Sequence, residues 1–160
     1  MGRFEIILGE RWATDRAVVE KLRAQGKGQG AFDFAHVLDV VDIFVDGANV
    51  GAAASADAIA CLTRDLLAAL ARLGAGEERK VAVPFYESSF ELVFQRVAEP
   101  PASPARAGRR GKTAKSPASD PRVLVTFFRG GPSPEILLRN HEVSLRDLSR
   151  AAAAAARRLA

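Results

Sequence analysis

Three segments of the chain carry the apolar periodicity of helices. Over residues 56–73 apolar positions recur every three or four residues, which predicts a helix with one buried face. A similar pattern covers residues 145–159, where Ser144 and Asp147 have the spacing of a capping box. A shorter helix is predicted at about residues 15–25. The sequence thus predicts two main helices and one short helix.

Strand patterns occupy much of the remaining chain. The alternating or continuously apolar runs lie at residues 4–8, 37–45, 81–86, 90–94, 123–128 and 136–143. The run at 37–45 is nearly all apolar apart from Asp39 and Asp42, which is typical of a buried strand. The later runs are joined by short turns, so they are expected to pair antiparallel. The sequence therefore predicts an α+β fold with one largely antiparallel sheet of five or six strands.

A segment without apolar periodicity separates two of these strands. Residues 98–121 contain five of the eight prolines and no large apolar side chain. Such a composition cannot bury enough surface to offset the entropy of ordering, so the segment is predicted to be a disordered, flexible insertion. Its basic side chains could contact phosphates without sequence specificity. They are Arg106, Arg109, Arg110, Lys112 and Lys115.

Length and the C-terminal pattern bear on domain organisation. A chain of 160 residues has the length of one domain, so residues 1–160 are expected to form a single α+β domain. The chain stops inside a strong helical pattern. This leads us to expect the N-terminal module of a longer protein.

Composition narrows the class of protein further. The net charge of +4 lies mostly in the insertion, so the remaining chain is not a basic nucleic-acid binder. Cys61 is the only cysteine, which excludes an intramolecular disulfide and a multi-cysteine metal site. Neither a secretory signal nor an apolar stretch of about 20 residues is present, so we expect a cytoplasmic protein away from membranes. The excess of Arg over Lys and the abundant Ala indicate a GC-rich bacterial genome.

One short motif offers candidate chemistry. Asp46-Gly47-Ala48-Asn49-Val50, directly after the apolar run Ile43-Phe44-Val45, resembles the first motif of PIN-like and NYN nucleases. The resemblance implies that Asp46 binds a divalent cation, which activates water for phosphodiester attack, and that Asn49 is a positioning group. The later strands supply no further acidic cluster, although Mg²⁺ needs several oxygen ligands. The competing interpretation is a turn at the end of a strand, with Asn49 in the left-handed region.

Apolar residues on both faces of several strands favour a different function. The second face of such a sheet must be covered, in part by the C-terminal helix, or must serve as an interface. The residues predicted for this interaction surface are Val123, Val125, Phe127, Leu124, Phe128 and Tyr86. The sequence therefore predicts a non-catalytic protein-interaction or regulatory module that binds a protein partner or a second copy, without a metal or cofactor. A divalent-metal-dependent nuclease built around Asp46 and Asn49 is the alternative.

Overall fold

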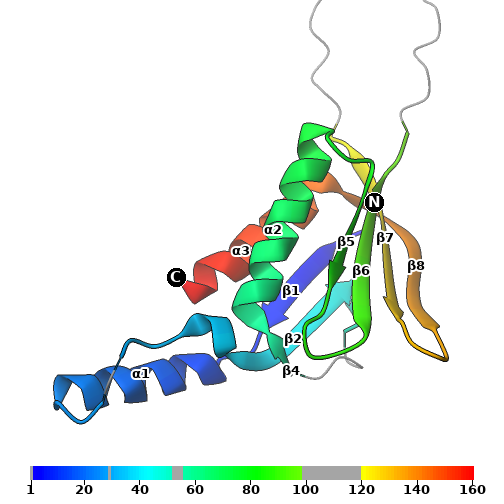
Figure 1. Cartoon of the computed structure of the whole chain (residues 1–160). Helices are drawn as coiled ribbons and strands as arrows, with labels where there is room; N and C mark the ends of the chain where they lie inside the picture. The colour runs from blue at the N-terminus through cyan, green and yellow to red at the C-terminus, as the bar shows by residue number, and fades with distance from the viewer. Residues whose placement is uncertain (1, 29, 52–55, 99–119) are drawn as a thin grey trace, which may run out of the picture.

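The computed structural model describes residues 2–28, 30–51, 56–98 and 120–160 and confirms the α+β class. Its strands form two antiparallel sheets of four strands each, where the sequence predicted a single sheet of five or six (Figure 1). Most of the predicted insertion at 98–121, including all five of its basic side chains, lies outside the described residues.

The first sheet is built around one long strand. Its members are β1 (Phe4–Leu8), β2 (Leu38–Val45), β3 (Ala48–Asn49) and β4 (Ala56–Ala58). Strand β2 pairs antiparallel with each of the other three. The two shortest members, β3 and β4, are the strands that the sequence did not predict, because two or three residues are too few to show a period.

The second sheet is a meander in sequence order, as its short turns predicted. Its members are β5 (Lys80–Pro84), β6 (Phe90–Arg96), β7 (Arg122–Arg129) and β8 (Glu135–Ser144). The two sheets meet where the amide of Gly2 donates to the carbonyl of Glu142 at 2.9 Å, beside a parallel bridge between Gly2 and Val143. The N-terminal strand therefore starts beside the end of β8.

Three α-helices accompany the sheets, and their bounds refine the prediction. They are α1 (Arg11–Ala24), α2 (Ile59–Ala75) and α3 (Leu145–Leu159), with a 3-10 turn, η1, at Phe34–His36. Helix α3 has the predicted bounds and is capped by the hydroxyl of Ser144, which accepts from the amide of Asp147 at 2.9 Å. Helix α2 starts three residues later than predicted because β4 occupies the preceding residues. Within the described ranges, no helix has the length and apolar character needed to cross a membrane.

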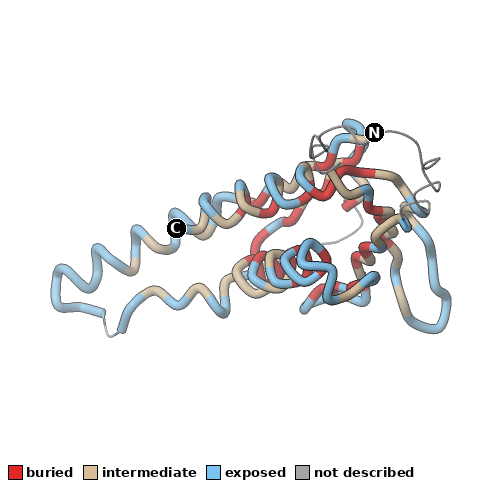
Figure 2. The backbone as a smooth tube through the Cα atoms, turned by 90° about the horizontal axis from the view of Figure 1, so that it is seen from above, coloured by how far each residue is buried: buried red, intermediate tan, exposed pale blue. Residues whose placement is uncertain are grey.

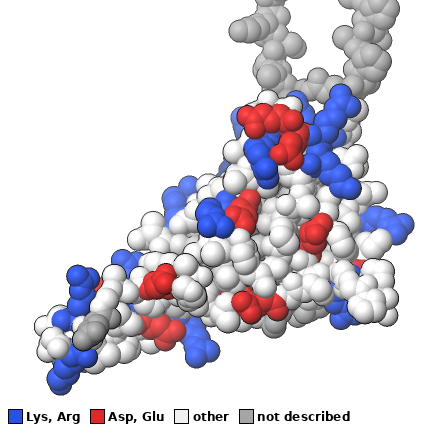
Figure 3. Space-filling view, in the orientation of Figure 1, with Lys and Arg blue, Asp and Glu red and all other residues white. Residues whose placement is uncertain are grey.

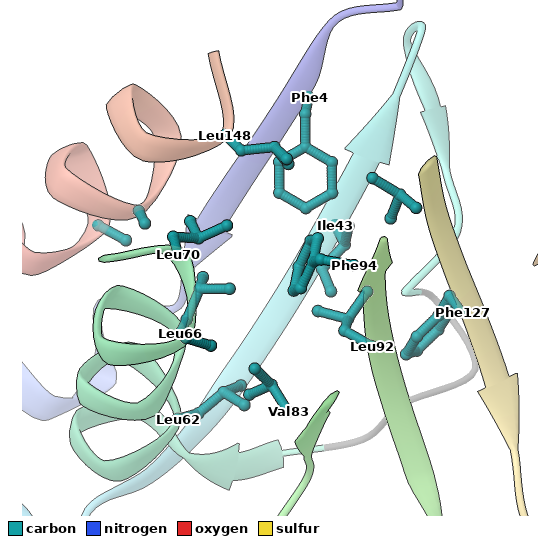
Figure 4. Packing of buried hydrophobic residues seen from close by; sticks show 14 of the residues in the cluster. Phe4, Ile43, Leu62, Leu66, Leu70, Val83, Leu92, Phe94, Phe127 and Leu148 are labelled. Atoms are coloured by element: carbon teal, nitrogen blue, oxygen red, sulfur yellow. The ribbon is translucent and has the colours of Figure 1, made fainter. Parts of the chain in front are cut away.

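Helices α2 and α3 pack against each other and share one hydrophobic core with the inner faces of both sheets (Figures 1 and 4). Leu62, Leu66 and Leu70 form the buried stripe of α2. Phe94 of β6 and Phe4 of β1 meet edge to face, with ring centroids 6.4 Å apart, so the two sheets touch directly. The sequence suggested that the C-terminal helix covers part of the second sheet face. Helix α3 instead turns its buried face towards α2 and β1, so it leaves the outer face of the β5–β8 sheet uncovered.

Helix α1 and the segment that returns from it to η1 extend away from the body as an arm (Figures 1 and 2). Helix α1 has no buried residue. At its base, Trp12 packs on Phe34 with ring centroids 5.4 Å apart. The carboxylate of Asp39 accepts from the amide of Trp12 at 3.1 Å, so a residue of β2 caps a helix whose own N-cap residue, Glu10, makes no side-chain cap.

Candidate interaction surface

The motif that resembles a nuclease forms a tight hairpin. Asp46 and Gly47 are the two central residues between β2 and β3, with φ of 51° and 81°. Positive φ at both positions is what a type I′ hairpin turn requires, and Asp-Gly is a preferred sequence for it. Asn49 lies in β3, where its amide nitrogen donates to Asp42 Oδ1 at 2.9 Å and its oxygen accepts from the amide of Gly51 at 3.0 Å. The turn interpretation is confirmed, but the left-handed non-glycine residue is Asp46.

The Asp46 carboxylate is engaged by the N-terminus and by β8. The amide of Arg3 donates to Asp46 Oδ1 at 2.6 Å. His141 Nε2 lies 2.9 Å from Asp46 Oδ2, without the alignment of a hydrogen bond, and a side chain at Gly2 would collide with this nitrogen. Among the residues that the structure describes, no group of three or more His, Cys, Asp or Glu side chains could hold a metal ion. The contacts of Asp46 tie three chain segments together and assemble no carboxylate cluster in the described part.

The six residues predicted as one interaction surface occupy three different environments. Val123, Val125 and Phe127 are fully buried in the core, because alternate residues of β7 face inward. Leu124 and Phe128 are half-buried on the outer face of the same strand. Tyr86 is exposed, but its hydroxyl contacts α2. Only Leu124 and Phe128 therefore lie on the predicted second face.

Tyr86 belongs to a small polar cluster on α2. Its hydroxyl donates to Asp65 Oδ2 and accepts from Arg64 Nη2 at 3.1 Å, while Arg64 Nε donates to Asp65 Oδ1 at 2.8 Å. The hydrogen bond to Asp65 raises the pKa of Tyr86 above its usual 10.0. The hydrogen bond from Arg64 lowers the pKa of Asp65. The cluster fixes Tyr86, the second residue after β5, against the helix.

The titration of Tyr86 can be followed directly, since it is the only tyrosine of the chain. Tyrosinate absorbance should show a midpoint above 10.0 in the folded protein, and Asp65→Asn should bring it back towards that value. Because the folded-state pKa is raised, this contribution to stability is present below the unfolded pKa of about 10 and is lost as the pH rises through the folded value. Asp147→Asn, on α3, serves as the control. An unchanged midpoint in Asp65→Asn would contradict the assignment.

Exposed aliphatic side chains gather on the outer face of the other sheet. Ile7 of β1 and Leu38 and Val40 of β2 are 42%, 47% and 46% exposed. Ile7 pairs with Asp42, so Val40 is its diagonal neighbour, and Leu38 is the next residue of β2 on the same face. We call these three residues the β1–β2 patch.

On the inner face of the same sheet, two acidic side chains are buried. Asp39, between Leu38 and Val40, is only 6% exposed and pairs across the strands with Asp57, which is 1% exposed. The Asp57 carboxylate accepts from the backbone amides of Tyr86 at 3.0 Å, Glu87 at 3.3 Å and Ala58 at 2.7 Å. Backbone amides thus satisfy both buried acids. At the start of β2, the carboxylate of Asp39 therefore faces the interior, while the aliphatic side chains of Leu38 and Val40 face solvent.

A groove of about 650 Å³ runs between β1 and α3. Its wall on α3 consists of Asp147, Arg150, Ala151, Ala154 and Arg158, and its other wall is β1 with the residues just before it. Arg158 also lines a hollow of about 320 Å³ beside Leu8 and the start of α1. The groove therefore follows α3 for most of its length.

Charges of both signs are interspersed on the face of the molecule shown in Figure 3.

No protein-family model matches the chain, and neither the curated proteins nor the solved structures contain a match. Function is therefore inferred from the surface of this molecule.

Proposed function

We propose that this chain is a non-catalytic protein-interaction module, in a bacterial cytosol, that binds a protein partner through the β1–β2 patch. The observation that carries the proposal is the inversion at the start of β2. Leu38 and Val40 face solvent while Asp39 between them is buried. Buried polar groups and contiguous exposed apolar groups are the informative departures from ordinary burial.

The patch has the properties of a docking surface. Single exposed aliphatic residues are common, but neighbouring ones on one face of a sheet mark an interaction site. Full burial of a large aliphatic side chain contributes about 1.5–3 kcal/mol, and covering the exposed half of each of these side chains would contribute about half of that to a complex. The sheet holds the three side chains in place, so a partner would not have to order them on binding.

The arm supports the same function. Helix α1 spans 14 residues, buries none of them, and exposes Val18 and Leu22 one turn apart. Helices of this length are marginal in water without tertiary packing. A partner that covers the exposed stripe would stabilise α1, so the arm is a natural second contact for a protein bound at the patch.

Val40→Lys tests the proposal. Burying a lysine in place of an aliphatic contact should weaken partner binding about tenfold to a hundredfold. The wild-type chain and the variant are immobilised in parallel and exposed to the same extract of the source cells. At least one protein should be retained by the wild type and lost from Val40→Lys.

Ser133→Lys is the matched control, because it adds the same charge in the exposed turn between β7 and β8. It should retain the partner, and both variants should keep the wild-type melting temperature. Equal retention of every protein by wild type and Val40→Lys would refute the role of the patch.

A further inference from the structure

Strand β1 is an edge strand that lacks the usual protection against pairing. In the described ranges, the edge strand β5 carries Pro84 and Lys80, and β8 carries two register shifts and Asn140 with φ of 47°. Such features keep edges from pairing with other chains. Strand β1, Phe-Glu-Ile-Ile-Leu, has one charged side chain, Glu5, but no proline, and its register with β2 is unbroken. Among the described residues at this edge, only Gly2, before the strand, is bonded to β8.

The backbone groups on the free edge of β1 follow from its pairing with β2. The carbonyl of Arg3 accepts from the amide of Asp46, and the amide of Gly9 donates to the carbonyl of Val40. Odd-numbered residues of β1 therefore bond to β2. The amides and carbonyls of Phe4, Ile6 and Leu8 point to the free edge, and this set is symmetric about Ile6.

Four residues of the groove wall on α3 have a matching symmetry: Asp147 and Arg158 lie at its two ends, and Ala151 and Ala154 lie between them. The fifth, Arg150, lies 3.4 Å from Asp147 of the same helix. Leu148 lies beside Phe4, and Arg158 lines the hollow beside Leu8, so α3 runs alongside β1 in the same direction (Figure 4). The midpoint between Ala151 and Ala154 consequently lies near Ile6.

We propose that a second copy of the chain occupies this groove, with the two β1 strands paired antiparallel and Ile6 on a two-fold axis. The same axis makes the two α3 helices antiparallel. It places Asp147 opposite Arg158 of the partner subunit, and Ala151 opposite Ala154 of the partner subunit. The same two-fold rotation thus gives the free backbone groups of β1 hydrogen-bond partners and brings Asp147 near Arg158 of the partner subunit.

The small side chains at the centre of the groove suit a helix–helix contact. Ala151 is half-buried and Ala154 is exposed, whereas the core-facing positions Leu148, Ala152 and Ala155 lie on a different side of α3. Alanine at the crossing point lets two helices approach closely. The pairing would join the two β1-containing sheets into one continuous sheet.

This inference goes beyond the proposed function, because the β1–β2 patch lies on the opposite face of the sheet from α3. Pairing of the β1 strands leaves both patches open and makes Ile7 a diagonal neighbour of Ile7 of the partner subunit. The dimer would present two adjoining patches on one surface.

Sedimentation equilibrium of the full chain tests the dimer. The wild type should dimerise reversibly, and Ala154→Arg, which inserts a long charged side chain at the two-fold axis, should raise the dimer dissociation constant at least about tenfold. Arg157→Glu, an exposed change on a neighbouring side of α3, should leave the constant unchanged. A wild type that stays monomeric, or an Ala154→Arg variant that dimerises equally well, overturns the proposal.

Charge exchange tests the orientation of the helices. Arg158→Glu and Asp147→Arg should each raise the dissociation constant about twofold to tenfold, since each places like charges opposite one another. The chain that carries both changes regains opposite charges and should dimerise like the wild type; failure of that rescue contradicts the antiparallel arrangement. Val40→Lys should dimerise normally, so loss of the dimer and loss of partner binding at the patch are separate results.

Discussion

Replacing Asp57 with alanine is expected to lower the free energy of unfolding by about 3 kcal/mol. The Asp57 carboxylate is buried in β4, just before α2, and accepts from the amides of Tyr86 and Glu87 in the β5–β6 turn. Alanine would leave these amides without their acceptor, and a buried unsatisfied donor costs about 1–3 kcal/mol. The turn between β5 and β6 would lose its hydrogen bonds to the first sheet, while the packing of Phe94 on Phe4 would remain.

Thermal denaturation measures the effect. For a chain of this size, a loss of about 3 kcal/mol lowers the melting temperature by about 6–12 °C. Asp42→Ala is the control, because its half-buried carboxylate accepts only from the side chain of Asn49 among the described residues, and it should cost less than about 1 kcal/mol. Equal melting temperatures for the two variants would show that the buried carboxylate contributes nothing.

Phe94→Ala should be the most damaging single change in the core, at about 3–5 kcal/mol. Phe94 is fully buried where the two sheets touch, with its ring edge to face with that of Phe4. The truncation removes apolar contacts and leaves a cavity that neighbours on two sheets and two helices cannot all move to fill.

Denaturant unfolding checks this prediction, with Phe128→Ala as the matched control. Phe128 belongs to the adjacent strand of the same sheet but lies half-buried on its outer face, so the same truncation there should cost about 1 kcal/mol. A cost at Phe94 no greater than at Phe128 would mean that the contact between the sheets does not stabilise the fold.

Much of the fold could be predicted from the sequence because it follows from local periodicity. The helix at residues 145–159 and the β5–β8 meander have clear periods and short turns. The division into two sheets was missed, because periodicity predicts strands but does not show which of them pair. Strands β3 and β4 were missed because they are too short to show a period. Asp46-Gly47 did carry a usable signal, because Asp-Gly after an apolar strand is typical of a two-residue hairpin.

The candidate surface could not be predicted from local patterns. The run at residues 37–45 indicated a buried strand, but Leu38 and Val40 are exposed. The burial of Asp39 and Asp57 depends on amides that are 27 and 29 residues away in the chain, at Trp12 and Tyr86. Such partners are known only once the tertiary structure is known.

The contact between β1 and α3 also constrains when the fold can form. Residues near the two ends of the chain meet there, and the amide of Gly2 bonds to Glu142. During synthesis β1 emerges before α3, so its inner residues Phe4 and Leu8 cannot be fully covered until α3 has been translated. Contacts of such long sequence separation slow folding. Until α3 is made, the apolar inner side chains of β1 and its free edge are exposed together, and such exposed surfaces make a partly folded chain prone to aggregation.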